Sequence, residues 1–90
     1  MQEFIVDLAG VHDDETLHDA LAEQLPLPSH YGRNLDALYD CLTDLSEPTE
    51  LHLAHKAELT ANLGIYADVF ETVLRDACAE NACLQLFLEE

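Results

Sequence analysis

Three short apolar segments, kept apart by long stretches with helical features, constrain the fold of this chain most strongly. The segments fall at residues 4–8, 51–53 and 83–88, and their length and apolar character predict strands. Two helices are expected between each pair of consecutive strands. Parallel neighbouring strands need helical crossovers of this kind, and such crossovers are right-handed. The order therefore predicts an α/β fold with a three-stranded parallel sheet and about four helices, in a single domain spanning residues 1–90.

Capping residues and helix breakers set the expected bounds of the first two helices. Asp13 and the acidic residues after it are typical of a helix start, and Pro26 ends the helix that follows. Asn34 can cap a second helix that runs to about Leu45. The stiff connector between these two helices contains Pro28 and precedes the most informative part of the chain.

The second half of the chain is predicted as two helices and a final strand. A brief helix over residues 56–63 is closed by Gly64, and a longer helix runs from residue 65 to about residue 79. The strand at residues 83–88 is nearly continuously apolar, as expected of a strand covered on both faces. The apolar side expected on the longer helix consists of Tyr66, Val69, Phe70, Val73 and Ala77.

The charge of the chain excludes several classes of partner. It has 3 basic and 19 acidic residues, a formal net charge of −16, whereas nucleic acids and anionic membranes are bound by excess Lys and Arg. With 49% hydrophobic residues it has enough apolar material to fold. Three cysteines are too few for a disulfide framework, and no signal peptide or membrane span is evident. We therefore expect a cytoplasmic protein with reduced thiols.

The second predicted helix carries three carboxylates on one face. At 100° per residue, Asp36, Asp40 and Asp44 lie within 80° of one another. Like charges at i, i+4 cost about 0.2–0.5 kcal/mol per pair. Local helix stability therefore does not explain the row, whereas a cationic partner does. Four leucines face the opposite way and two further side chains flank the acids: Leu35, Leu38, Leu42 and Leu45, then Tyr39 and Thr43.

A purely solvating role for these acids is the competing interpretation. Glu15, Asp19 and Glu23 form the same i, i+4, i+8 row on the first predicted helix, and a salt-rich habitat would favour acidic surfaces everywhere. The second helix differs in its neighbourhood, because aromatic residues beside charges are typical of binding hot spots. Its neighbours are His30, Tyr31 and Tyr39, with Gly32 allowing close backbone approach.

Residues 28–43 also resemble a known family. They read Pro-Ser-His-Tyr-Gly-Arg-Asn-Leu-Asp-Ala-Leu-Tyr-Asp-Cys-Leu-Thr. The core of this match is Tyr-Gly-x-Asn-Leu-Asp-Ala-Leu-x-Asp-Cys-Leu-Thr, which is similar to the signature of barstar, the cytoplasmic inhibitor of the ribonuclease barnase. A looser resemblance covers nearly the whole chain. It implies a three-stranded parallel sheet packed with helices, in agreement with the fold predicted from the residues.

The barstar resemblance further implies a mechanism and a set of contact residues. The second helix and the loop before it would plug the active site of a basic extracellular-type ribonuclease in a one-to-one complex, and the free inhibitor would be a monomer. Asp40 would take the place of a substrate phosphate, and Asp36 would pair with basic groups at the rim. The full expected partner-binding set is His30, Tyr31, Gly32, Asn34, Asp36, Tyr39, Asp40, Thr43, Asp44 and Asp76.

Four positions depart from the family pattern. His30 stands where barstar has tyrosine, Tyr39 replaces tryptophan, Asp44 replaces glycine and Asp76 replaces glutamate. These differences indicate a ribonuclease other than barnase, or a changed docking. The alternative is a binding or immunity module of the same fold for a basic protein that is not a ribonuclease. The resemblance also implies a cis peptide bond before Pro48.

Catalysis and cofactor or metal binding are not expected. Asp36 and Asp40 would sit on a convex helix face, where nothing desolvates them or separates their pKa values. No nucleophile triad, phosphate-binding glycine loop or HExxH motif is present. His52-x-x-His55 and two cysteines lack the spacing of a structural zinc site. The cysteines, Cys41, Cys78 and Cys83, are instead expected to be buried or partly exposed thiols.

Overall fold

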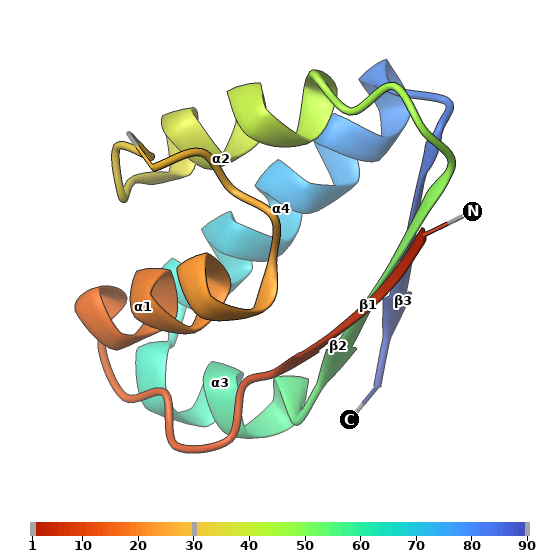
Figure 1. The fold of residues 1–90 in the computed structure, drawn as a ribbon. Helices are drawn as coiled ribbons and strands as arrows, with labels where there is room; N and C mark the ends of the chain where they lie inside the picture. The colour runs from red at the N-terminus through yellow and green to blue at the C-terminus, as the bar shows by residue number, and fades with distance from the viewer. Residues whose placement is uncertain (1, 30, 90) are drawn as a thin grey trace.

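The computed structural model describes residues 2–29 and 31–89 and contains the predicted sheet and helices (Figure 1). The four helices of the described residues all lie on one side of the three strands (Figure 1). The strand order is β1-β2-β3, with both pairs parallel, so the predicted α/β fold is confirmed. In chain order the elements are β1 (Gln2–Asp7), α1 (Asp14–Gln24), α2 (Leu35–Thr43), β2 (Thr49–Ala54), α3 (Lys56–Leu63), α4 (Ile65–Glu80) and β3 (Leu84–Leu88).

The central strand β2 divides the sheet into a covered face and an open face. Thr49, Leu51 and Leu53 are buried, while the residues between them are less so. Leu51 pairs in register with Phe4 and Leu86, so one row of apolar side chains crosses the sheet beneath the helices. The helices complete this core with buried side chains from each of them: Leu17, Leu21, Leu38, Leu42, Leu59, Phe70 and Leu74.

The open face corrects the expectation for the last strand. Burial alternates along β3, and Phe87 is 41% exposed, so this strand is covered on one face only. Every helix of the described residues lies on the same side, so none of these helices covers the opposite face of the strand (Figure 1). The Phe87 ring instead stacks on His52 of β2, with ring centroids 4.7 Å apart. The nearly continuous apolar run in β3 therefore does not mean that both faces are covered. On the open face, the Phe87 ring packs against the His52 ring.

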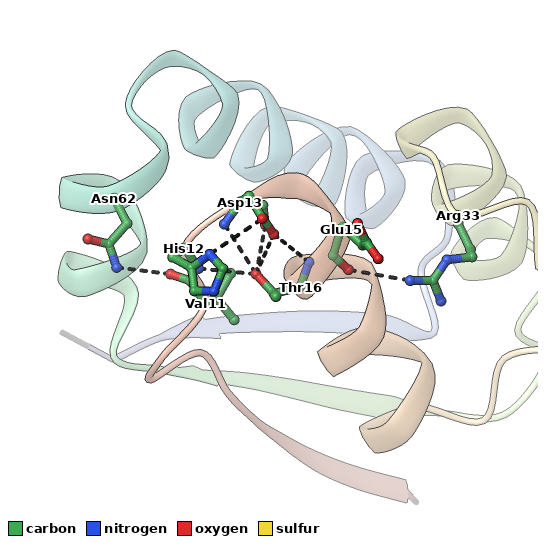
Figure 2. A network of polar contacts seen from close by, with 7 residues as sticks. All are labelled: Val11, His12, Asp13, Glu15, Thr16, Arg33 and Asn62. Atoms are coloured by element: carbon green, nitrogen blue, oxygen red, sulfur yellow. Dashed lines mark hydrogen bonds and ion pairs between the residues drawn. The ribbon is translucent and has the colours of Figure 1, made fainter.

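Side-chain caps fix where α1 begins (Figure 2). The Thr16 amide donates to Asp13 Oδ1 at 2.8 Å, and the Asp13 amide donates to Thr16 Oγ1 at 3.1 Å. This reciprocal pair satisfies two amides that have no partner within the helix. Asn62 on α3 donates to the Val11 carbonyl at 2.9 Å and so holds the segment before α1. The predicted start at Asp13 is confirmed.

Asn81 joins the ends of α2 and α4. It is the C-terminal cap of α4, as predicted, and its side-chain amide donates to the carbonyls of Leu42 and Leu45 at 3.0 and 2.9 Å. Those carbonyls belong to the last turn of α2 and the residues after it, where backbone acceptors have no partner within the helix. The regular helix α2 ends at Thr43, two residues before the predicted bound.

Two further expectations are wrong. On α4 the buried residues include Leu74, whereas Val69 is 45% exposed, so the buried face is rotated from the predicted one. All peptide bonds of the described residues are trans, including the bond before Pro48. Trans is the favoured isomer by about 0.5–1 kcal/mol. In this arrangement the Pro48 carbonyl accepts a hydrogen bond from the Gln2 amide at 2.8 Å, which starts the pairing of β1 with β2.

Within residues 2–29 and 31–89 no helix has the length and apolar content needed to cross a bilayer.

Candidate partner-binding surface

The helix α2 presents its carboxylates to solvent because its leucines are buried. Leu38 is 0% exposed and Leu42 is 2% exposed, and this packing fixes the rotation of the helix. Asn34 caps the first turn by accepting from the Ala37 amide at 2.7 Å. The opposite side carries three exposed carboxylates, here called the acidic face of α2: Asp36, Asp40 and Asp44.

Within the part of the chain that the structure describes, no Lys or Arg side chain forms an ion pair with the acidic face. Arg33 forms its ion pair with Asp19 on α1, and Lys56 Nζ lies 2.6 Å from Glu71 Oε1. Arg75 Nε also bonds Glu71, at 3.0 Å from Oε2. Hydrogen bonds from these two basic groups lower the pKa of Glu71. Across the described residues, all three basic side chains therefore pair with acids outside the acidic face.

Tyr39 and α4 extend the acidic face on one side. Burial raises the pKa of Tyr39, and the nearby carboxylates of Glu80, Asp76 and Asp40 raise it further. Asp76 lies on α4, which packs against α2, and its charge acts on Tyr39 at the edge of the acidic face. Glu80 was not anticipated from the sequence. Its position four residues after Asp76 on the same helix is the signal that could have revealed it.

The Thr43 hydroxyl is used within α2. It donates to the Tyr39 carbonyl at 2.9 Å and lies 3.2 Å from the Asp40 carbonyl. Thr43 is half-buried, so any contact with a partner involves its methyl group or the remaining acceptor capacity of the hydroxyl.

A buried histidine anchors the loop that precedes α2. His18 on α1 is 2% exposed, and its Nδ1 lies 2.6 Å from the Tyr31 hydroxyl. Its Nε2 lies 3.0 Å from the Tyr66 hydroxyl on α4. Burial is the largest cause that lowers the pKa of His18, followed by the charge of Arg33, and burial raises the pKa of Tyr31 to about 12. The Tyr31 hydroxyl thus faces inward and holds the loop.

The backbone of this loop is shaped by two neighbouring residues. A Cβ on Gly32 would lie 3.2 Å from the Ala37 Cβ, which is closer than most such contacts, so glycine lets the loop pack on the start of α2. Arg33 has a left-handed φ of 57°, and its guanidinium donates to the Glu15 carbonyl at 3.4 Å (Figure 2). The loop is therefore tied to α1 through Arg33. His30, which was also expected here, lies outside the described residues.

The open sheet face holds a group of side chains able to ligate a metal. Among the described residues, the ligand atoms of Glu3, Glu50 and His52 lie within 4.8 Å of one another. His52 Nε2 is 3.2 Å from Glu50 Oε1, so the carboxylate and the imidazole already satisfy each other. His55 does not join this group, because its Nδ1 bonds Asp7 Oδ1 at 2.9 Å. The set of two histidines and two cysteines considered from the sequence is not assembled.

Comparison with known proteins identifies the family of this chain. The family model described as "Barstar (barnase inhibitor)" matches residues 1–89. The chain belongs to the barstar family. A curated relative, "Putative ribonuclease inhibitor YrdF" of Bacillus subtilis (strain 168), is 41% identical over 81 residues, which is 89% of each protein. The resemblance to the barstar family seen in residues 28–43 is thus confirmed, and α2, which carries Asp36 and Asp40, lies within this segment.

Proposed function

We propose that this protein inhibits a basic ribonuclease by placing α2 and the loop before it in the enzyme's active site. Asp40 takes the position of a substrate phosphate, and Asp36 pairs with basic groups at the rim. The observation that carries this proposal is the acidic face of α2, which is exposed and, among residues 2–29 and 31–89, forms no ion pair with a Lys or Arg side chain. Membership of the barstar family supports the same function.

The physical basis of the proposal is that a carboxylate can take the place of a phosphate in a site built for phosphate. A carboxylate offers Arg and Lys charge-assisted hydrogen bonds of the kind they form with phosphate. The helix α2 is held by its buried leucines and its capped first turn, so its carboxylates are already in place. Little conformational entropy is therefore lost when a partner binds. The convex face then fits a concave site built for an RNA backbone.

The net charge of the protein favours fast association with such an enzyme. A formal charge of −16 on 90 residues attracts a cationic partner over a distance set by the ionic strength. At about 0.15 M salt the Debye length is about 8 Å, so steering acts mainly near contact. This electrostatic attraction adds speed, while the specific pairs of Asp36 and Asp40 supply affinity.

The remaining residues have supporting roles in the proposal. Tyr39, Thr43, Asp44 and Asp76 pack or pair beside the two central carboxylates. Gly32 and Asn34 shape the approach of the loop, Tyr31 holds it from beneath, and His30 contacts the partner. We further propose that the protein acts as a single-domain monomer in the cytoplasm, binds one ribonuclease, is not itself an enzyme and needs no cofactor.

Inhibition of a panel of basic microbial ribonucleases, barnase included, tests the proposal. We expect stoichiometric inhibition of at least one enzyme and a loss of about 2–5 kcal/mol in binding free energy for Asp40→Asn. Glu23→Gln on α1 is the matched control, because Glu23 is exposed and distant in sequence from the acidic face. It should change binding by no more than about 0.5 kcal/mol. Equal losses from the two variants, or no inhibited enzyme, would contradict the proposal.

Asp44 motivates a second candidate function. It adds charge and bulk at the end of α2, where barstar has a glycine, so the surface also suits a basic partner that is not a ribonuclease. This candidate is an immunity or binding module of the same fold. It predicts that the protein captures a basic partner without ribonuclease activity, whereas the first candidate predicts ribonuclease activity in the released fraction.

A further inference from the structure

A cavity of about 390 Å³ opens beside the acidic face of α2. It lies between the connector after α1, the C-terminal half of α2 and the first two strands. Its volume falls at the lower end of the range typical of small-molecule sites, about 300–1,000 Å³. The walls are mainly apolar and include Phe4 and Leu51 from the sheet, Leu27 and Pro28 from the connector, and Leu42 and Leu45 from α2 and the residues after it.

The polar groups of the cavity are concentrated on α2. Asp40 and Asp44 belong to its lining and lie one helical turn apart, with Cys41 beside them. Burial, and then the charges of these two aspartates, raise the pKa of the Cys41 thiol. The thiol is thus a neutral, weakly polar part of the wall at physiological pH. The buried Thr49 hydroxyl is already used, since it donates to the Glu47 carbonyl at 2.8 Å.

The combination of an apolar interior with two carboxylates defines one class of ligand. An apolar group would replace water against the leucines and prolines, which is favourable in proportion to the area covered. A cationic head would meet carboxylates that, within the described part of the chain, pair with none of the protein's Lys or Arg side chains. An anion would face both aspartates and the net charge of −16.

We propose that this cavity is a binding site for a small organic cation, a compact apolar body that carries an amidinium, guanidinium or ammonium group. The apolar part occupies the space between the connector and the sheet, and the cationic group pairs with Asp40 and Asp44. This site does not depend on the proposed inhibition of a ribonuclease. It shares Asp40 with that surface, so a bound cation and a basic protein partner exclude each other.

Titration of the ¹⁵N-labelled protein with three ligands of nearly equal shape tests the proposed site. Benzamidine is a cation, benzamide is neutral and benzoate is an anion. We expect benzamidine to cause saturable amide shifts at Leu27, Cys41 and Leu45, with binding about tenfold tighter than that of benzamide because of its charge-assisted hydrogen bonds. Benzoate should cause none. Absence of saturable shifts with benzamidine, or equal binding of benzamidine and benzamide, would overturn the proposal.

A pair of charge reversals locates the bound cation. Asp44→Lys changes a residue of the cavity lining, while Asp36→Lys makes the same change in net charge on the same face but outside the lining. Asp36 is eight residues from Asp44 and four residues from Asp40 along the helix, about 12 Å and about 6 Å at a rise of 1.5 Å per residue. Its charge therefore acts on the bound cation only through solvent, where the Debye length is about 8 Å at 0.15 M salt.

Benzamidine binding should weaken by about tenfold in Asp44→Lys and by no more than about threefold in Asp36→Lys. Equal weakening in both variants would show non-specific attraction to the acidic surface and would overturn the site. The same pair separates the two proposals, because Asp36→Lys should impair inhibition of a ribonuclease while benzamidine binding persists.

Discussion

Lowering the pH from 7 to 5 should destabilise the fold through one buried histidine. His18 is 2% exposed and lies between the hydroxyls of Tyr31 and Tyr66. Both tyrosines can accept a hydrogen bond from a protonated imidazole, so hydrogen bonding does not oppose protonation. The opposition comes first from burial and then from the charge of Arg33, which together lower the pKa of His18. Asp14 and Asp19 offset this only in part.

The sign and upper limit of the effect follow from proton linkage. Because the pKa of His18 is lower in the fold than its ordinary value of 6.5, the unfolded chain takes up a proton first as the pH falls. The contribution of His18 is therefore fully present above pH 6.5 and is lost as the pH falls toward the folded-state pKa. Its largest slope is about 1.4 kcal/mol per pH unit, so by pH 5 the loss is at most about 2 kcal/mol.

Urea unfolding of the wild type and of His18→Gln at pH 7, 6 and 5 measures this contribution. Glutamine can hydrogen-bond both tyrosines but does not titrate in this range. The difference in unfolding free energy between wild type and variant should therefore shrink as the pH falls. If the two proteins lose stability in parallel between pH 7 and pH 5, the assignment of this pH dependence to His18 is refuted.

Three further changes test the fold and the proposed mechanism. Leu38→Ala empties a fully buried site beneath α2 and should cost about 2–5 kcal/mol of unfolding free energy, measured by urea unfolding against the exposed Ala22→Gly as a control. Asp13→Ala removes the side-chain cap of α1 and should lower the free energy of unfolding by about 1 kcal/mol, measured by thermal unfolding. An unchanged unfolding free energy would show that the Thr16 side chain alone is sufficient to cap the helix. The rate of association with a ribonuclease that this protein inhibits, measured by stopped-flow mixing, should fall as the salt concentration rises toward about 1 M. A rate that does not depend on salt would contradict electrostatic steering.

Local sequence signals predicted the parts of the structure that depend on local physics. Asn34 caps α2, and of the four leucines predicted to face inward Leu38 and Leu42 are buried and the other two are partly buried. The position of the acidic face could therefore be predicted from the sequence. The parallel sheet could also be predicted, because two helices separate each pair of strands and leave no tight hairpin.

Features that depend on contacts between distant residues could not be predicted. His18 meets partners 13 and 48 residues away, so nothing in its neighbourhood in the sequence marks it as the anchor of the loop. The buried side of α4 was also misassigned. Val69 and Leu74 are both apolar, and only packing against α2 and the sheet decides that Leu74 is buried and Val69 is exposed.

Competition with a nucleotide tests the central claim of phosphate mimicry most directly. Binding of the protein to a ribonuclease that it inhibits can be measured by titration calorimetry with and without a saturating nucleoside monophosphate in the enzyme's active site. If Asp40 occupies the place of a substrate phosphate, the nucleotide should lower the apparent affinity in proportion to the fraction of active sites that it leaves free. An affinity that stays unchanged with the active site filled would show that the acidic face of α2 binds elsewhere and would contradict the proposed mechanism.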